Sequence, residues 1–311
     1  MSTAFYNPAE CRLHDMGQGH PECPQRLDAI GDHLRATGLD VALQFREAPD
    51  VTLEQISRAH SSGFVLELQD VLQQVEASGR PRALDPDTIA CPKTWAAVLR
   101  AAGAAVAATD DVLSGRADNA FCAIRPPGHH ATRDRAMGFC FLNSVAIAAR
   151  HALDDGGLER VAIIDFDVHH GNGTEDIIAG DERVLMCSIF QHPLYPYSGA
   201  VPKGTNMINV PLAPYTRGPE VRGVIGEMWL PRLEEFKPQM VFVSAGFDAH
   251  REDELGQLGL VEADYEWITR QIKAVAERHA SGRIVSCLEG GYNLGALARS
   301  VAAHLRVLAD V

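Results

Sequence analysis

Five short apolar runs, rich in β-branched residues, alternate along the chain with segments of helical periodicity. Continuous apolar runs of this length are typical of parallel strands that are buried on both faces. The runs are FCAI (121–124), RVAIIDF (160–166), RVLMCSI (183–189), QMVFVSA (239–245) and RIVSCL (283–288). Their alternation with helices predicts an α/β fold made of βα units.

Several of the helical segments carry end signals. Asn143 suits an N-cap, Pro219 suits a first helical turn, and the glycines at 156–157 suit the end of a helix. In the first 90 residues the pattern predicts one helix at about 24–37 and one or two more within 51–75, and it identifies no strand. The remaining predicted helices are 94–109, 143–154, 219–236, 262–280 and 295–309.

Composition is that of a globular protein with a large core, since 46% of the residues are hydrophobic and 22% are charged. No internal repeat, low-complexity tract or Ser/Gly linker divides the 311 residues. Because α/β units can build one sheet over more than 250 residues, we predict a single domain, 1–311. We expect an open, mostly parallel sheet with helices on both faces.

Charge and cysteine content narrow the function. With 28 Lys and Arg against 41 Asp and Glu, the net charge is −13, which disfavours direct nucleic-acid binding and favours cationic partners. Residues 1–17 carry no basic segment followed by an apolar stretch, and no window is apolar enough to span a membrane, so we expect a cytoplasmic protein without membrane contact. The seven cysteines form no CxxC pair, which is typical of reduced thiols. The pattern does not indicate an oligomeric state.

Each predicted strand runs into a polar, glycine-rich loop. Ligands of open parallel sheets bind beyond the carboxyl ends of the strands, where such loops converge. A purely structural protein has little reason to gather His, Asp, Tyr and Gly at one edge of its sheet. The five loops are RPPGHHA, DVHHGNGT, FQHPLYPYSG, GFDAHRED and EGGYNLG.

One of these loops predicts a metal site. Asp165, Asp167 and His169 stand at i, i+2 and i+4, so in an extended chain they project from one face. Asp248 follows another buried strand. Each of these residues alone would suggest only a solvated residue at the end of a strand. Several buried carboxylates and an imidazole directed at one point, however, are stable only when a cation neutralises their charge. Three ligands with an open position are typical of catalytic Zn²⁺, although the same donors also accept Fe²⁺ or Mn²⁺.

The tandem histidines His129 and His130 predict proton transfer. A histidine gains a fixed tautomer and higher basicity by donating its second ring N–H, and Asp165 and Asn172 are candidate acceptors. The alternative is that one ring packs and the other is solvated. The glycines of EGGYNLG would allow Tyr292 to face a substrate carbonyl.

Together these motifs resemble the zinc-dependent histone deacetylase family, especially its class II branch and the bacterial histone deacetylase-like amidohydrolases. The blocks occur in family order over nearly the whole chain: HPECPQRL, RPPGHH, GFCFLN, DFDVHHGNGT, SAGFDAH and EGGYNL. The resemblance implies the arginase/deacetylase fold and a metal-dependent hydrolysis of N-acetyl amides, with acetyl-lysine or another acetylated amine as substrate. Asn172 in HGNGT favours class II, because class I members carry a second Asp there.

The resemblance also implies two bound cations. Zn²⁺ would be held by Asp167, His169 and Asp248. A structural K⁺ would be held by backbone or side-chain atoms of five residues: Asp165, Asp167, His169, Ser188 and Ile189.

Catalytic roles follow from the same resemblance. His130 would be the general base, and His129, paired with Asp165, would be its electrostatic partner. Asn172, the other candidate acceptor named above from the chemistry of histidine, is grouped with these catalytic residues. Tyr292 would bind the carbonyl oxygen as it becomes an oxyanion.

A narrow acyl channel is implied as well, with Gly138, Phe139 and Tyr195 in its walls. Leu255 aligns with the position that is Glu in polyamine-preferring relatives, but its neighbour Glu254 would take that place if the alignment slipped by one. Leu255 favours acyl-lysine, and Glu254 would favour an acetylpolyamine.

Other functions stay open beside deacetylation of lysine. Ala90 replaces the acidic residue with which class I enzymes hold the substrate backbone. An acetylpolyamine amidohydrolase, or an amidase or esterase for another small acylated molecule, is the second reading. A non-catalytic metal-binding protein would be expected to lack a ligand, histidine or tyrosine of the set, and none is missing. A binuclear arginase-type hydrolase would need further Asp and His ligands.

Overall fold

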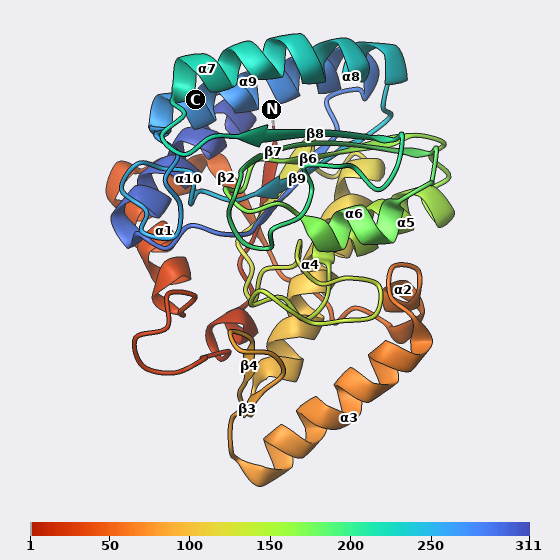
Figure 1. Cartoon of the computed structure of the whole chain (residues 1–311), viewed down its shortest axis with the longest axis vertical. Helices are drawn as coiled ribbons and strands as arrows, with labels where there is room; N and C mark the ends of the chain where they lie inside the picture. The colour runs from red at the N-terminus through yellow and green to blue at the C-terminus, as the bar shows by residue number, and fades with distance from the viewer. Residues whose placement is uncertain (1) are drawn as a thin grey trace.

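The computed structural model describes residues 2–311 and is built on an eight-stranded sheet (Figure 1). Every neighbouring pair of strands in this sheet is parallel. The spatial order is β2 (Leu43–Arg46), β1 (Thr3–Tyr6), β5 (Asn119–Cys122), β10 (Ile284–Leu288), β9 (Val241–Ala245), β6 (Val161–Asp165), β7 (Val184–Gln191) and β8 (Met207–Leu212). A short antiparallel hairpin is separate, with strands β3 (Arg82–Ala83) and β4 (Ile89–Ala90). The predicted open parallel sheet is confirmed.

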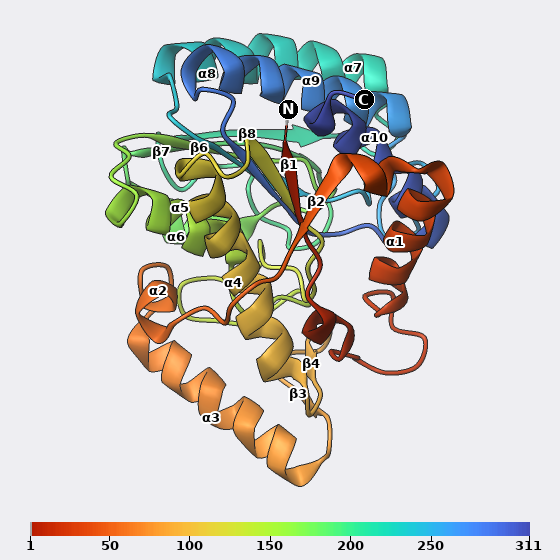
Figure 2. The same ribbon diagram turned by 180° about the vertical axis from the view of Figure 1, so that it is seen from behind.

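Helices cover both faces of the sheet, as the two opposite views show (Figures 1 and 2). One layer contains α1 (Gln25–Thr37), α7 (Gly218–Val224), α8 (Leu230–Phe236), α9 (Glu262–His279) and α10 (Leu294–Ala309). The opposite layer contains α4 (Thr94–Leu113), α5 (Ser144–Asp154) and α6 (Asn172–Ile178), beyond which lie α2 (Leu53–Ser57) and α3 (Ser62–Ser78). Short 3₁₀ turns occupy Ala9–Arg12 and Leu39–Ala42.

Within residues 2–311, we find no helix with both the length and the apolar character that a membrane span requires.

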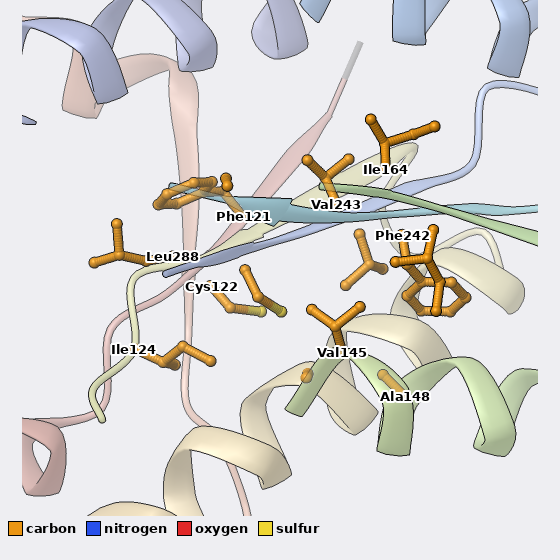
Figure 3. Close-up of a cluster of buried hydrophobic side chains, with 14 of the residues drawn as sticks. Phe121, Cys122, Ile124, Val145, Ala148, Ile164, Phe242, Val243 and Leu288 are labelled. Atoms are coloured by element: carbon orange, nitrogen blue, oxygen red, sulfur yellow. The ribbon is translucent and has the colours of Figure 1, made fainter. Parts of the chain in front are cut away.

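The core lies between the sheet and its two helix layers. Alternate residues of β9 point to opposite faces, with Val243 on one side and Phe242 on the other, where Val145 and Ala148 of α5 pack (Figure 3). Residues of the central strands are fully buried, which explains why their sequences read as continuous apolar runs. The small side chains of α4 allow close packing, and a Cβ at Gly103 would lie 1.9 Å from the carbonyl oxygen of Pro49.

Most predicted elements occur, and the differences have local causes. β5 begins and ends two residues before the predicted 121–124. The predicted helix 219–236 is interrupted by a π-helical turn at Ile225–Trp229, which separates α7 from α8. Asn143 caps α5 as predicted, because its side chain accepts the N–H of Ala146 at 2.9 Å.

Three strands of the sheet were not predicted. β2 and β8 form its two edges, and each exposes part of its length, so neither has a continuous apolar sequence. β8 also contains Pro211, which is tolerated at an edge. β1 is buried but only four residues long.

Candidate active site

Three predicted metal ligands converge at the carboxyl edge of the sheet. Asp167 and His169 follow β6, and Asp248 follows β9, the strand paired with β6. One ligand atom of each lies within 4.8 Å of the others. His169 presents Nδ1 at 3.1 Å from an oxygen of Asp167 and 3.1 Å from an oxygen of Asp248. The two aspartates are buried.

Backbone N–H groups hold the two carboxylates in place. Asp167 accepts the N–H of Gly290 at 2.8 Å, and Asp248 accepts the N–H of Val168 at 2.8 Å. A Cβ at Gly290 would lie 2.0 Å from an oxygen of Asp248. The close approach of β10's loop to the ligands therefore requires glycine at this position.

The donor set fits a divalent cation. Burial raises the pKa of Asp248, and the neighbouring Asp167 raises it further. Burial disfavours the charged form of His169, yet hydrogen bonds to the two carboxylates outweigh burial and raise its pKa to about 10. Two buried carboxylates facing one imidazole nitrogen are stabilised by a metal ion, and carboxylate oxygen with imidazole nitrogen is a zinc donor set.

Asp165 does not join this group. β6 ends at Asp165, and the chain bends at the next residues, so the strand alternation that we expected to align Asp165 with Asp167 does not continue. Instead an oxygen of Asp165 lies 3.0 Å from Nδ1 of His129. The three side chains that could hold one metal ion together are Asp167, His169 and Asp248.

The two histidines after β5 lie against each other with ring centroids 4.0 Å apart. Nδ1 of His130 lies 2.8 Å from the side-chain oxygen of Asn172. Burial lowers the pKa of His130, and the neighbouring His129 and His169 lower it further. For His129, burial is outweighed by Asp167 and Asp165, so its pKa is raised. The pKa values of the two rings are thus shifted in opposite directions, a division typical of acid–base sites.

A pocket of about 430 Å³ leads to this site. Phe139 packs edge-on against Tyr292 with centroids 5.9 Å apart, and Tyr195 packs edge-on against His130 at 5.2 Å. Leu255 is part of the wall, whereas Glu254 is exposed and not among the lining residues. The lining consists of His20, Pro21, Asp87, His130, Gly138, Phe139, His169, Leu194, Tyr195, Tyr197, Leu255 and Tyr292.

Three of the five residues predicted to hold K⁺ lie on two paired strands, and the other two, Asp167 and His169, follow the first of these strands. Asp165 of β6 is the register partner of Ser188 of β7, and Ile189 follows in the same strand. The Ser188 hydroxyl is buried and has no hydrogen-bond partner among residues 2–311. A buried oxygen without a partner suits an oxygen-ligated cation.

Three side chains that support the site were not predicted. Glu289 accepts the N–H groups of Gly128 at 2.6 Å and His129 at 3.1 Å. Arg26 donates to the carbonyl oxygen of Gly291 at 2.7 Å, and its guanidinium lies 5.0 Å above the ring of Tyr292.

The third is Asp253, which accepts the backbone N–H of Tyr292 at 2.6 Å. Glu289 and Arg26 stand inside the motifs EGGYNL and HPECPQRL, and Asp253 follows SAGFDAH, but nothing in those strings indicates which backbone groups they bind.

Comparisons with known proteins agree on one family. Residues 20–308 match the histone deacetylase domain family. The histone deacetylase-like amidohydrolase of Pseudomonas aeruginosa is 39% identical over 88% of this chain and 73% of its own length. The probable deacetylase of Archaeoglobus fulgidus is 38% identical over 96% of this chain and 83% of its own length. The crystal structure of the HDA15 HD domain matches with a TM-score of 0.92 and 32% identity, covering 99% of this chain and 90% of that one.

Proposed function

The chain belongs to the histone deacetylase family, and from this premise we propose that it is a zinc-dependent amidohydrolase that removes the acetyl group from acetyl-lysine. The observation that carries the proposal is the meeting of a three-ligand metal cluster with the His129–His130 pair at one pocket. A family hydrolase with these groups in contact has the parts needed for amide hydrolysis.

The metal and the protein side chains would have separate roles in the hydrolysis. Zn²⁺ held by Asp167, His169 and Asp248 would polarise the scissile carbonyl and acidify water. His130 takes the proton of the attacking water, since its lowered pKa leaves the ring neutral and able to accept one. Asn172 holds Nδ1 of His130, so the other ring nitrogen is the one that acts.

The remaining side chains stabilise the charges that develop during the reaction. Tyr292, which lines the pocket, donates its hydroxyl to the carbonyl oxygen as negative charge develops there. Burial raises the pKa of Tyr292, which keeps this hydroxyl protonated. His129, with its raised pKa and its Asp165 partner, supplies a fixed positive charge beside His130. We also assign the K⁺ site to the region of Ser188, which would fix the strand ends that carry the ligands.

Substrate profiling tests the proposal. Purified zinc-loaded protein is assayed with an acetyl-lysine peptide, acetylputrescine and an aryl acetate. We expect the peptide to be hydrolysed best, because the apolar Leu255, and not the neighbouring Glu254, lines the channel. Preference for acetylputrescine or for the aryl acetate would identify the chain as a polyamine amidohydrolase or an esterase instead.

Two variants test the mechanism. Loss of one oxyanion donor costs about 10²–10³ in kcat in well-studied hydrolases, so we expect Tyr292→Phe to fall in this range. His130→Ala is expected to lose about 10²–10⁴. Normal turnover by either variant, still folded and loaded with zinc, contradicts the mechanism. Glu277→Ala, which alters an exposed residue of α9 outside the pocket, is the control.

A further inference from the structure

A second concavity, of about 470 Å³, adjoins the channel wall. Leu255 lines the channel, and the next residue, Gly256, lines this concavity. Its charged lining residues are two arginines, Arg217 and Arg251, and the remainder is Tyr215, Gly256, Gln257, Leu258 and Gly259. Within the described part of the chain, neither guanidinium has a hydrogen-bond or ion-pair partner.

The arginines stand on a hydrogen-bonded frame. The N–H of Tyr215 donates to the carbonyl oxygen of Gln257 at 2.8 Å, and the N–H of Gly259 donates to Thr216 at 2.9 Å. Residue 217 forms a parallel bridge with residue 259, and the N–H of Arg251 donates to the carbonyl oxygen of Leu260 at 2.9 Å. Both arginines therefore flank the segment 256–260 from fixed backbone positions.

Three of the nearby carboxylates are committed elsewhere, whereas Glu220 accepts the backbone N–H of Arg217 at 2.7 Å and Glu254 is exposed. Asp253 accepts backbone N–H groups of Leu255, Tyr292 and Asn293. Glu252 and Glu262 both pair with Arg299, at 2.8 and 2.5 Å. Two unpaired arginines lining one concavity are notable in a chain with a net charge of −13. They place two guanidinium groups beside the channel wall.

On the basis of the proposed function, we propose that this concavity is a subsite for an acidic side chain that flanks the acyl-lysine of a peptide substrate. The planar guanidinium matches a carboxylate in bidentate geometry. An extended peptide advances about 3.3 Å per residue, so a residue next to the acyl-lysine at the channel mouth reaches the loop that both pockets share. The same arginines repel an acetylpolyamine, whose other amines are cationic.

The opposite charge appears elsewhere at the mouth. Asp87, in the β3–β4 turn, is exposed and lines the channel pocket. With Asp87 and the arginine pair both present, a peptide with its acidic residue on one side of the acyl-lysine binds better than one with the acidic residue on the other side. The subsite therefore also sets the direction in which the peptide lies.

Matched peptides test the subsite. Each contains one acetyl-lysine with Glu, Gln or Lys at a single flanking position, placed before or after it. Exposed ion pairs contribute about 0.2–1 kcal/mol each, so two of them predict a Glu over Gln preference of about two- to thirtyfold in kcat/KM, expressed in KM. In the Arg217→Gln/Arg251→Gln double variant the preference falls to about one. The wild-type preference also falls in 0.5 M salt, because exposed charges are screened.

Arg306→Gln is the control for charge. Arg306 is exposed near the end of α10, where Leu308 accepts a hydrogen bond from Asn119 at the start of β5, so it lies at the opposite edge of the sheet. This variant must keep the Glu preference. Equal hydrolysis of all peptides by the wild type, or a preference that survives in the double variant, overturns the subsite alone. No hydrolysis of any peptide overturns the proposed function, and the subsite with it.

Discussion

Replacing Glu289 tests whether this buried carboxylate positions the catalytic histidines. Its side chain accepts the N–H groups of Gly128 and His129 and the hydroxyl of Ser244, the last at 3.2 Å. Glu289→Ala leaves two buried N–H donors without a partner. Each costs about 1–3 kcal/mol, so the free energy of unfolding falls by about 2–6 kcal/mol.

Activity should fall with the same change. Because the two N–H groups belong to the loop that carries His129 and His130, their release moves both rings. A displacement of about 1 Å in a catalytic group can cost about 10²-fold, and we expect a loss of this order in kcat/KM for Glu289→Ala. Glu289→Gln keeps an oxygen that accepts both N–H groups. Burial raises the pKa of Glu289 to about 7, so the wild-type acceptor is only partly charged near neutral pH, and Glu289→Gln should lose at most about 1 kcal/mol.

The measurements are denaturant unfolding and kcat/KM on an acetyl-lysine peptide, both at confirmed zinc occupancy. Glu277→Ala, at an exposed residue of α9, is the control and should change neither quantity by more than about 0.5 kcal/mol. If Glu289→Ala loses less than about 1 kcal/mol and keeps its activity, the buried N–H groups do not depend on this carboxylate, and the positioning role is refuted.

Three further outcomes follow from the geometry. Gly290→Ala should weaken zinc binding measured by calorimetry, because the new Cβ would lie 2.0 Å from an oxygen of Asp248, whereas Gly223→Ala, with open space around it, should not. Zinc at a hundred times its Kd should stabilise the apo protein by about 2.7 kcal/mol in thermal unfolding, and Asp248→Asn should abolish most of this gain. Burial lowers the pKa of His60 to about 4 from an ordinary 6.5. As pH falls from 6.5 towards 4, His60 becomes protonated in the unfolded state but stays neutral in the folded state, so the free energy of unfolding declines. Between pH 7.5 and 5.5 the free energy of unfolding should fall by about 1.4 kcal/mol from this cause, and His60→Gln should remove this contribution when unfolding is measured in urea at each pH. If the dependence of the free energy of unfolding on pH is unchanged in the variant, His60 is not held neutral in the folded protein.

The sequence predicted the central part of the sheet because burial leaves a clear pattern. A strand covered on both faces must be apolar at every position, as RVAIIDF and QMVFVSA are. The edge strands β2 and β8 are only partly buried, so their sequences lack that run. The π-helical turn at Ile225–Trp229 was also missed, because a single wider turn leaves the helical periodicity almost unchanged.

For the site, the sequence by itself determined which residue types stand at the ends of the buried strands, since motif strings such as DFDVHHGNG and SAGFDAH are local. Only the tertiary structure decided how those groups divide. In the fold, Asp167, His169 and Asp248 lie close together, whereas Asp165 contacts His129. This division arises because the chain bends after β6 and the alternation of the strand stops.

The supporting contacts of Glu289, Arg26 and Asp253 also depended on the fold. They join segments that are far apart in sequence through single backbone groups, such as the N–H of Gly128 and the carbonyl oxygen of Gly291. A sequence motif specifies side chains, whereas the distance between two backbone groups of separate loops is set by how the strands beneath them pack.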